Sequence, residues 1–337
     1  MSKFSLEVLS KYVHPFIQTT DPEVILGSVF GEDVALTRIE DGMLVSHVDP
    51  IVGAVKDIGW LAVHVACNDV ATSGTPPRWI LLLVLVPHKE DEHLLEDIMR
   101  DAGRAANEIG VSIIGGHTGY SSNLSRPLVA VTALGTLAKQ NPVLTKGAHV
   151  GDHLFITKGI ALEGTAILAN DFANTASQLG ISEHELTMAR ELMKSVSIIP
   201  EALIFAQQGA TAMHDVTRGG LLETLLEVAK LSEVGIEVDA SRIPISPVVS
   251  RFSKAFQFDP LKMISSGTLV AAIPLEHVEA TRKSLDDKGI VYADIGEVIE
   301  GKGVQIIQEE QATLYQEIHC EEDELARMWE IYSQDAV

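Results

Sequence analysis

The segment from Ala212 to Leu225 (AMHDVTRGGLLETL) places an acid, a hydroxyl, a guanidinium and two glycines within the six residues from Asp215 to Gly220. An apolar helical pattern follows, so a helix is expected to begin behind the glycines. The first turn of such a helix presents unpaired N–H groups and the positive end of its dipole, which suits phosphate. Asp215 could hold a cation beside that anion, and Arg218 could donate to phosphate oxygens. An ordinary capped helix with a solvated arginine would give the same pattern.

Three aspartates in the first half of the chain stand near the ends of expected elements. Asp33 precedes a strand-like run, and Asp49 is expected to end a strand, because the following proline stops its ladder. Asp69 falls near the end of a helix that begins around Asp57, on its apolar face. One buried carboxylate is usually a hydrogen-bonded structural residue. Three together favour a Mg²⁺ site, because hard cations need several oxygen ligands.

Two glycine-containing segments could approach a ligand closely. Gly115-Gly-His-Thr118 is expected to close a strand and open a loop, where the glycines admit a ligand and His117 and Thr118 offer polar groups. A tight turn explains this segment equally well. Lys158 and Glu163 lie in a second polar segment flanked by glycines, between Thr157 and Thr165, which indicates a ligand site more weakly. His64 and Cys67, three residues apart, fit a packed core pair better than a zinc site.

Length, charge and cysteine content narrow the class of protein. At 337 residues the chain is expected to form two domains. With 25 basic and 47 acidic residues its net charge is −22, which argues against nucleic-acid or membrane partners. Cys67 and Cys320 are too few for a disulfide framework. The first 20 residues do not resemble a signal peptide, and the apolar run 79–87 is too short to span a bilayer. A cytoplasmic protein is therefore expected.

The secondary-structure elements that would position these residues indicate an α+β fold. The chain has no P-loop, no strand–GxGxxG–helix fingerprint and no Gly-x-Ser-x-Gly elbow. The first half is expected to be a sheet with long helices on one face. Its expected elements are strands at 43–48, 79–86 (buried on both faces), 111–114 and 127–137, with helices at 58–71 and 89–109.

A polar, glycine-rich stretch at 145–152 marks the expected domain boundary. We therefore predict an N-terminal domain of residues 1–150 and a C-terminal domain of residues 151–337. The acidic tail at 317–331 is expected to be a helix.

Taken in order, five blocks of the chain resemble the superfamily of aminoimidazole ribonucleotide synthetase (PurM). Other members are thiamine-monophosphate kinase, selenophosphate synthetase and the hydrogenase maturation protein HypE. The resemblance covers about residues 25 to 300, and the segment after 213, with the later VGIEVDASRIPI, is most similar to HypE. The blocks are GEDVAL at 31–36, SHVDP at 46–50, DIGWLAVHVACNDVATSGTPP at 57–77, IIGGHTG at 113–119 and MHDVTRGGLLETLLEVA at 213–229.

The resemblance implies a fold of two α+β domains and a homodimer in which N-terminal strands of both subunits form a barrel. It also implies ATP and Mg²⁺ bound in a cleft without a P-loop, and transfer of the γ-phosphoryl group to an acceptor. The implied metal ligands are Asp33, Asp49, Asp69 and Asp215. The implied nucleotide-binding residues are Asn68, Gly115, Gly116, Thr118, Lys158 and Thr217, with His117 and Arg218 as catalytic candidates.

This chain departs from HypE in two places. His117 stands where HypE has an acidic residue, and selenophosphate synthetases have a similar Gly-Gly-His. HypE ends in the cysteine that carries its carbamoyl group, whereas this chain ends in YSQDAV, so dehydration on a terminal cysteine is not expected. The early catalytic residue of selenophosphate synthetase has no counterpart either, since no cysteine precedes Cys67.

The sequence thus predicts an ATP- and Mg²⁺-dependent enzyme similar to HypE. It is expected to phosphorylate a carbonyl or amide oxygen of an unassigned substrate, and whether dehydration follows stays open. Three alternatives stay open: a non-catalytic nucleotide-binding partner in metallocentre assembly, a small-molecule kinase resembling thiamine-monophosphate kinase, and a structural dimer without nucleotide binding.

Overall fold

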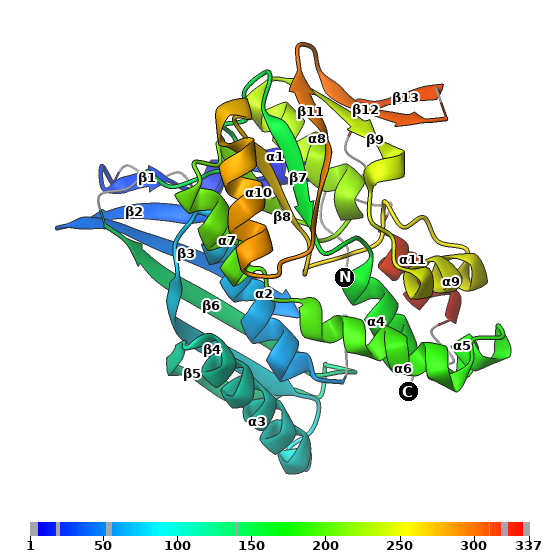
Figure 1. The fold of residues 1–337 in the computed structure, drawn as a ribbon. Coiled ribbons are helices and arrows are strands. Elements are labelled where there is room, and N and C mark those ends of the chain that lie inside the picture. The colour runs from blue at the N-terminus through cyan, green and yellow to red at the C-terminus, as the bar shows by residue number, and fades with distance from the viewer. Residues whose placement is uncertain are drawn as a thin grey trace.

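The computed structural model describes residues 6–17, 21–51, 56–138, 141–309, 311–317 and 323–332. Two separate sheets organise these residues (Figure 1). None of the helices in this part of the chain is long and apolar enough to cross a bilayer. Cys320 lies outside the described residues.

The first sheet contains six strands in the order β1-β2-β3-β6-β4-β5. Neighbouring strands are antiparallel except β4 and β5, which run parallel. In β6 every second residue is buried, the pattern of a sheet packed on one face. The strands are β1 (Val24–Leu26), β2 (Ala35–Ile39), β3 (Gly42–Ile51), β4 (Pro77–Val86), β5 (Ser112–Tyr120) and β6 (Leu128–Leu137).

Two long helices, α2 (Ile58–Thr72) and α3 (Glu92–Ile109), accompany this sheet, as predicted for the first half of the chain (Figure 1). Every residue of α2 is buried, because α2 also contacts α7 and β8 of the second half. A Cβ on Gly59 would lie 2.2 Å from the carbonyl oxygen of Ile98, so only glycine allows α2 and α3 to approach this closely. The helix that carries Asp69 is therefore held from all sides.

The second sheet contains seven strands in the order β13-β12-β9-β11-β7-β10-β8. Only β12 and β9 run parallel. Helix α8 (Gly220–Ser232) packs apolar residues into one core cluster of this sheet, while α7 (Ile199–Gln207) and α10 (Val278–Asp287) pack into another. The strands are β7 (His153–Thr157), β8 (Ala212–Asp215), β9 (Gly235–Asp239), β10 (Leu269–Ile273), β11 (Tyr292–Ile299), β12 (Gly303–Gln308) and β13 (Gln311–Tyr315).

A group of helices beside the second sheet shares one continuous core with the first sheet. In Figure 1 these helices gather below the second sheet. They are α4 (Leu162–Asp171), α5 (Ala173–Gln178), α6 (Glu183–Glu191), α9 (Pro247–Phe256) and α11 (Glu324–Tyr332). The remaining short elements are α1 (Leu6–Tyr12), η1 (His14–Phe16), η2 (Leu192–Ser195), η3 (Ala240–Arg242) and η4 (Leu275–His277).

Three expectations from the sequence were wrong. Strand β4 is not buried on both faces: Leu82 is 3% exposed but Leu81 is 39% exposed. The segment from Gly115 to Thr118 is not a loop but the middle of strand β5. Asp49 does not end β3, because Pro50 pairs with Ala130 of β6 inside the ladder. Pro50 is tolerated there because the pairing of β3 with β2 extends only to Ser46, which leaves one side of β3 unpaired at Pro50.

The first sheet is open within one chain. The predicted barrel would require strands from a second copy, so it remains a prediction.

Candidate functional site

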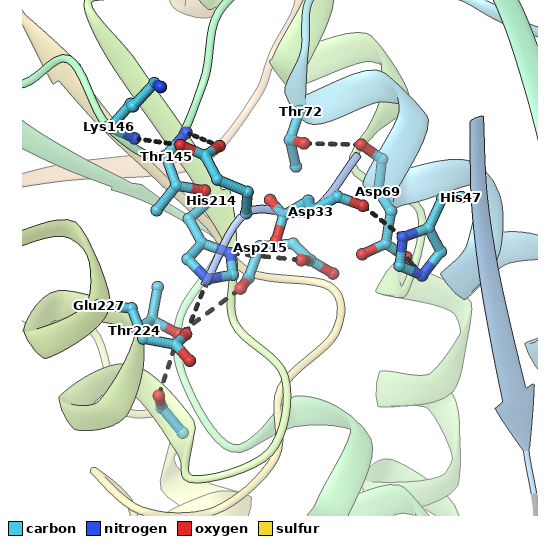
Figure 2. A network of polar contacts seen from close by, with 12 residues as sticks. Asp33, His47, Asp69, Thr72, Thr145, Lys146, His214, Asp215, Thr224 and Glu227 are labelled. Carbon is cyan, nitrogen blue, oxygen red and sulfur yellow. Dashed lines mark hydrogen bonds and ion pairs between the residues drawn. The ribbon is translucent and has the colours of Figure 1, made fainter. Parts of the chain in front are cut away.

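Three buried aspartates meet where the two sheets approach each other (Figure 2). Asp33 lies just before β2, Asp69 lies in the last turn of α2, and Asp215 is the last residue of β8. His214 Nδ1 is 2.9 Å from Asp33 Oδ1 and 3.7 Å from Asp215 Oδ1. Ligand atoms of these three residues lie within 4.8 Å of one another. Residues far apart in the sequence therefore form one compact acidic site.

The loop that carries Asp33 is held by hydrogen bonds to two other segments. The Glu32 carboxylate accepts the backbone N–H groups of Thr145 at 3.0 Å and Lys146 at 3.2 Å (Figure 2). Nδ1 of His47 forms a hydrogen bond with the carbonyl oxygen of Asp33. The loop is thus tied to β3 on one side and to the segment leading into the second sheet on the other.

Strand β3 directs two further polar side chains toward the same site. Successive side chains of a strand alternate between its faces, so His47 and Asp49 share a face with the buried Val45. His47 Nε2 lies 3.4 Å from Asp69 Oδ2. Asp49 is close enough for its charge to raise the pKa of Asp69. This alternation could have identified His47 from the sequence, because it stands two residues before Asp49.

Burial and mutual repulsion both disfavour the charged forms of the carboxyl groups in this site. Burial raises the pKa of Asp69 well above its ordinary value, and Asp215, Asp33 and Asp49 raise it further. Burial also raises the pKa of Asp215. Both carboxylate oxygens of Asp215 and one of Asp33 are buried without a hydrogen-bond donor among the described residues. Such an arrangement is costly unless a cation is bound, and its all-oxygen donors fit Mg²⁺.

His214 is the main internal counter-charge of this site, and sequence reasoning missed it. Its Nε2 lies 2.8 Å from Glu227 Oε2 on α8, and its Nδ1 faces Asp33. Burial alone would lower the pKa of His214, but Asp33, Asp215 and Glu227 together raise it well above its ordinary value. An imidazolium has no free lone pair on either nitrogen and does not act as a metal ligand. His214 instead connects the loop before β2 to α8.

The expected phosphate site at the start of α8 is partly occupied by the chain itself. Gly219 and Gly220 do precede the helix in left-handed conformations. However, a Cβ on Gly219 would lie 1.8 Å from Oε2 of Glu223, so this carboxylate sits against the glycine. The N–H of Leu222 donates to the carbonyl oxygen of Leu261 at 3.0 Å. This helix start is therefore partly occupied by contacts within the chain, and anion binding there remains a prediction.

Arg218 and Thr217 lie between β8 and α8, and both are half-buried. The Arg218 guanidinium is 3.9 Å from Asp323 Oδ2, a long ion pair, and it donates no hydrogen bond to any other described residue. Its charge also lowers the pKa of Glu163, although the net pKa of Glu163 is raised. Arg218 thus lies beside the acidic site rather than within it.

Two predicted nucleotide-binding residues are occupied by contacts within the chain. The Asn68 amide donates to the carbonyl oxygens of Val196 at 2.8 Å and Ser266 at 3.1 Å, and it accepts the N–H of Ile198. Lys158 Nζ donates to the carbonyl oxygens of Ser197 and Gly267 and lies 2.7 Å from Glu201 Oε1. These contacts give both residues a structural role, and nucleotide binding by them remains a prediction.

The segment from Gly115 to Thr118 lies apart from the three aspartates within one chain. Strands β6 and β4 separate β5 from β3. His117 pairs with Leu83 of β4, so it faces the side of the sheet on which Leu81 is exposed. If the segment contributes to the site, a second copy of the chain is the simplest way to bring it there.

Two family models match most of the chain. The model described as "AIR synthase related protein, N-terminal domain" matches residues 31–137. The model described as "AIR synthase related protein, C-terminal domain" matches residues 149–309. They include all four aspartates predicted as metal ligands.

Curated relatives span most of the chain. A putative hydrogenase expression/formation protein of Methanocaldococcus jannaschii is 28% identical, with 74% of this chain and 73% of the relative covered. A selenide, water dikinase of Carboxydothermus hydrogenoformans is 25% identical, with 91% and 95% covered. The carbamoyl dehydratase HypE of Rhizobium leguminosarum bv. viciae is 27% identical, with 80% and 77% covered.

Solved structures show the same fold. AaThiL complexed with AMPPCP and TMP superposes with a TM-score of 0.70 at 19% identity, covering 86% of this chain and 91% of that one. The hydrogenase maturation protein HypE in complex with ATP superposes with a TM-score of 0.67 at 21% identity, covering 93% and 95%. The chain therefore belongs to the AIR synthase related protein family, within the PurM/HypE superfamily.

Proposed function

We propose that this protein is an ATP- and Mg²⁺-dependent phosphoryl-transfer enzyme, similar to HypE, that phosphorylates a carbonyl or amide oxygen of its substrate. The observation that carries this proposal is the set of buried aspartate oxygens without donors at the junction of the two sheets. The names of the relatives support it, since they include a dikinase and structures bound to ATP or its analogue.

In this proposal Asp33, Asp69 and Asp215 hold the metal, with Asp49 beside them. Bound Mg²⁺ would supply neutralisation of the phosphate charge, which is the main requirement of phosphoryl transfer. Arg218 then faces the γ-phosphate or the acceptor, because it offers uncommitted donors next to the acidic site. His214 holds Asp33 in place through its contact with Glu227.

A homodimer completes the proposed site. The face of the first sheet that carries Leu81 at 39% exposure also presents Val48 at 60% exposure. Exposed apolar side chains on one sheet face suit an interface with another sheet. Pairing of this face across two copies would form the predicted barrel. It would also give Gly115, Gly116, His117 and Thr118 a place at the nucleotide.

Binding of Mg–ATP tests this proposal by isothermal titration calorimetry. We expect a dissociation constant below about 1 mM, which corresponds to roughly −4 kcal/mol. Asp69→Asn should weaken this binding at least about tenfold, since it removes a charged metal ligand. Asp97→Asn, on the exposed surface of α3, is the matched control and should bind as the wild type does. Wild-type protein that shows no binding up to several millimolar Mg–ATP would refute the proposal.

Two alternatives differ in the fate of ATP. A small-molecule kinase is favoured by the superposition on AaThiL at a TM-score of 0.70, and it would produce a stable phosphorylated acceptor. A non-catalytic partner in metallocentre assembly would bind Mg–ATP and form no ADP with any acceptor. Incubation with γ-labelled ATP separates the three, because it distinguishes released phosphate, phosphorylated product and unchanged ATP.

A further inference from the structure

Glu163 is a buried acid that the proposed metal site does not use. It lies in the first turn of α4 and is only 3% exposed. Its Oε2 accepts the N–H of Ser266 at 3.2 Å and also the Ser266 hydroxyl. Its other oxygen receives no hydrogen bond from the described residues, and no lysine or arginine among them forms an ion pair with it.

The loop that presents Glu163 has an unusual backbone. Lys158 and Ala161 both adopt left-handed conformations, with φ of 60° and 59°, which cost about 1 kcal/mol or more each in residues other than glycine. The Thr268 hydroxyl donates to the carbonyl oxygen of Gly159, and the N–H of Leu162 donates to Ser265 Oγ at 3.0 Å. The segment 265–268 therefore holds a strained loop, and such strain is concentrated at functional positions.

The same segment fixes Glu163 relative to the acidic site. The carbonyl oxygen of Ser266 accepts the Asn68 amide at 3.1 Å, and Asn68 precedes Asp69 on α2. Ser266 thus contacts Glu163 with its N–H and hydroxyl, and α2 with its carbonyl. Ser266 therefore links Glu163 to the helix that carries Asp69.

The charges of Arg218 and Asp49 both act on Glu163. The pKa of Glu163 is raised to about 7, mainly by burial. The charge of Asp49 also raises this pKa, whereas the hydrogen bonds from Ser266 and the charge of Arg218 lower it. A carboxyl group whose pKa is close to 7 can both accept and release a proton near neutral pH. Arg218 and Asp49 are thus both close enough to Glu163 for their charges to affect its pKa.

We propose that Glu163 is the general base that removes the acceptor's proton during phosphoryl transfer. This inference rests on the proposed function and adds the base that it lacks. With an amide acceptor, the amide proton passes to the Glu163 carboxylate while the amide oxygen forms a bond to the γ-phosphorus. The bond from that phosphorus to the β–γ bridging oxygen breaks, and ADP leaves with the electron pair. With water as acceptor, an O–H proton passes to Glu163 and inorganic phosphate forms.

The acceptor class follows from this role. The acceptor must carry a proton that Glu163 can remove. In water or an alcohol this proton is on the attacking oxygen, and in a primary amide it is on the nitrogen conjugated to that oxygen. Water can therefore stand in for the unidentified acceptor, and ADP formation from Mg–ATP in water is the assay.

The test compares Glu163→Gln with the wild type in ADP formation and in Mg–ATP affinity. We expect ADP formation to fall about 100-fold or more, with the dissociation constant of Mg–ATP within about twofold of the wild type. Glu237→Gln is the matched control, because Glu237 is half-buried on β9, outside the proposed site, and this variant should keep both values. Glu163→Asp, which keeps the carboxylate but shortens the side chain, should give an intermediate rate and provides a second variant if Glu163→Gln does not fold.

Each outcome decides between the inferences. ADP formation by Glu163→Gln or Glu163→Asp equal to that of the wild type would overturn the assignment of the base. Wild-type protein that binds Mg–ATP but forms no ADP in water would overturn it as well. Failure of the wild type to bind Mg–ATP would instead contradict the proposed function.

Discussion

Replacement of Asp215 by asparagine should stabilise the protein while it abolishes metal binding. Ligand atoms of Asp33 and Asp215 lie within 4.8 Å of each other. Two like charges at that distance repel by about 3.5 kcal/mol at an effective dielectric constant of about 20. His214, 2.9 Å from Asp33, offsets part of this repulsion. We therefore expect the metal-free variant to gain about 1–2 kcal/mol, because asparagine keeps the shape of the side chain and removes its charge.

Thermal unfolding measured by scanning fluorimetry at pH 8 tests both parts of this prediction. In EDTA, Asp215→Asn should melt about 2–5 °C above the wild type. With Mg²⁺ and ATP the wild type should gain stability and the variant should not, since ligand that binds only the folded state raises its melting temperature. Asp97→Asn should behave as the wild type in both conditions. A variant that melts lower in EDTA and still responds fully to Mg–ATP would refute the reasoning.

Four further predictions follow from the same contacts. Asp49→Asn should weaken Mg–ATP binding by calorimetry while circular dichroism stays unchanged; if Asp49→Asn and Asp69→Asn both bind as the wild type does, the metal assignment is wrong. Lys158→Met should cost about 3 kcal/mol in urea unfolding, because it leaves Glu201 buried without its partner, and a cost near zero would contradict this structural role. Gly116→Ala should disrupt the pairing of β5, since its Cβ would lie 1.9 Å from the carbonyl oxygen of Leu82; the expected result in size-exclusion chromatography is loss of the dimer, against a wild-type profile if β5 is not at the interface. ADP formation should fall as the pH drops below about 7, because burial raises the pKa of Glu163 to about 7 and its protonated form cannot accept a proton; a rate that is level from pH 5 to 8 would contradict the assigned base.

The parts of this structure that the sequence predicted are those with strong periodicity. Helices α2 and α3 carry apolar residues at helical spacing, and buried residues alternate with less buried ones along strand β6. Asp33, Asp69 and Asp215 were also predictable as a group, because the family's motifs mark all three. Their convergence in the structure supports that grouping, although their roles remain predictions until metal binding is measured.

The errors arose where side-chain pattern carries little information. Gly115 and Gly116 have no side chains to alternate, so their strand looked like a loop. The run from Trp79 to Val86 is apolar on both faces, yet one face is uncovered within a single chain. Apolar residues that face a partner copy cannot be distinguished in sequence from residues that face a core.

The contacts of His214, Glu223 and Glu227 depend on tertiary structure. Glu227 neutralises a histidine on another element, and Glu223 partly occupies the start of its own helix. Neither role follows from the spacing of residues, because both depend on which side of α8 faces β8. We therefore assign the proposed metal binding to the aspartates, while the glycine pair permits the turn into α8.

A crystal structure with Mg²⁺ and a non-hydrolysable ATP analogue tests the central claim most directly. We predict metal coordinated by oxygens of Asp33, Asp69 and Asp215 at about 2.0–2.1 Å, with the γ-phosphate on the side of Arg218 and Glu163. Nucleotide bound elsewhere, or phosphates bound at this junction with no metal touching these three carboxylates, would contradict the account.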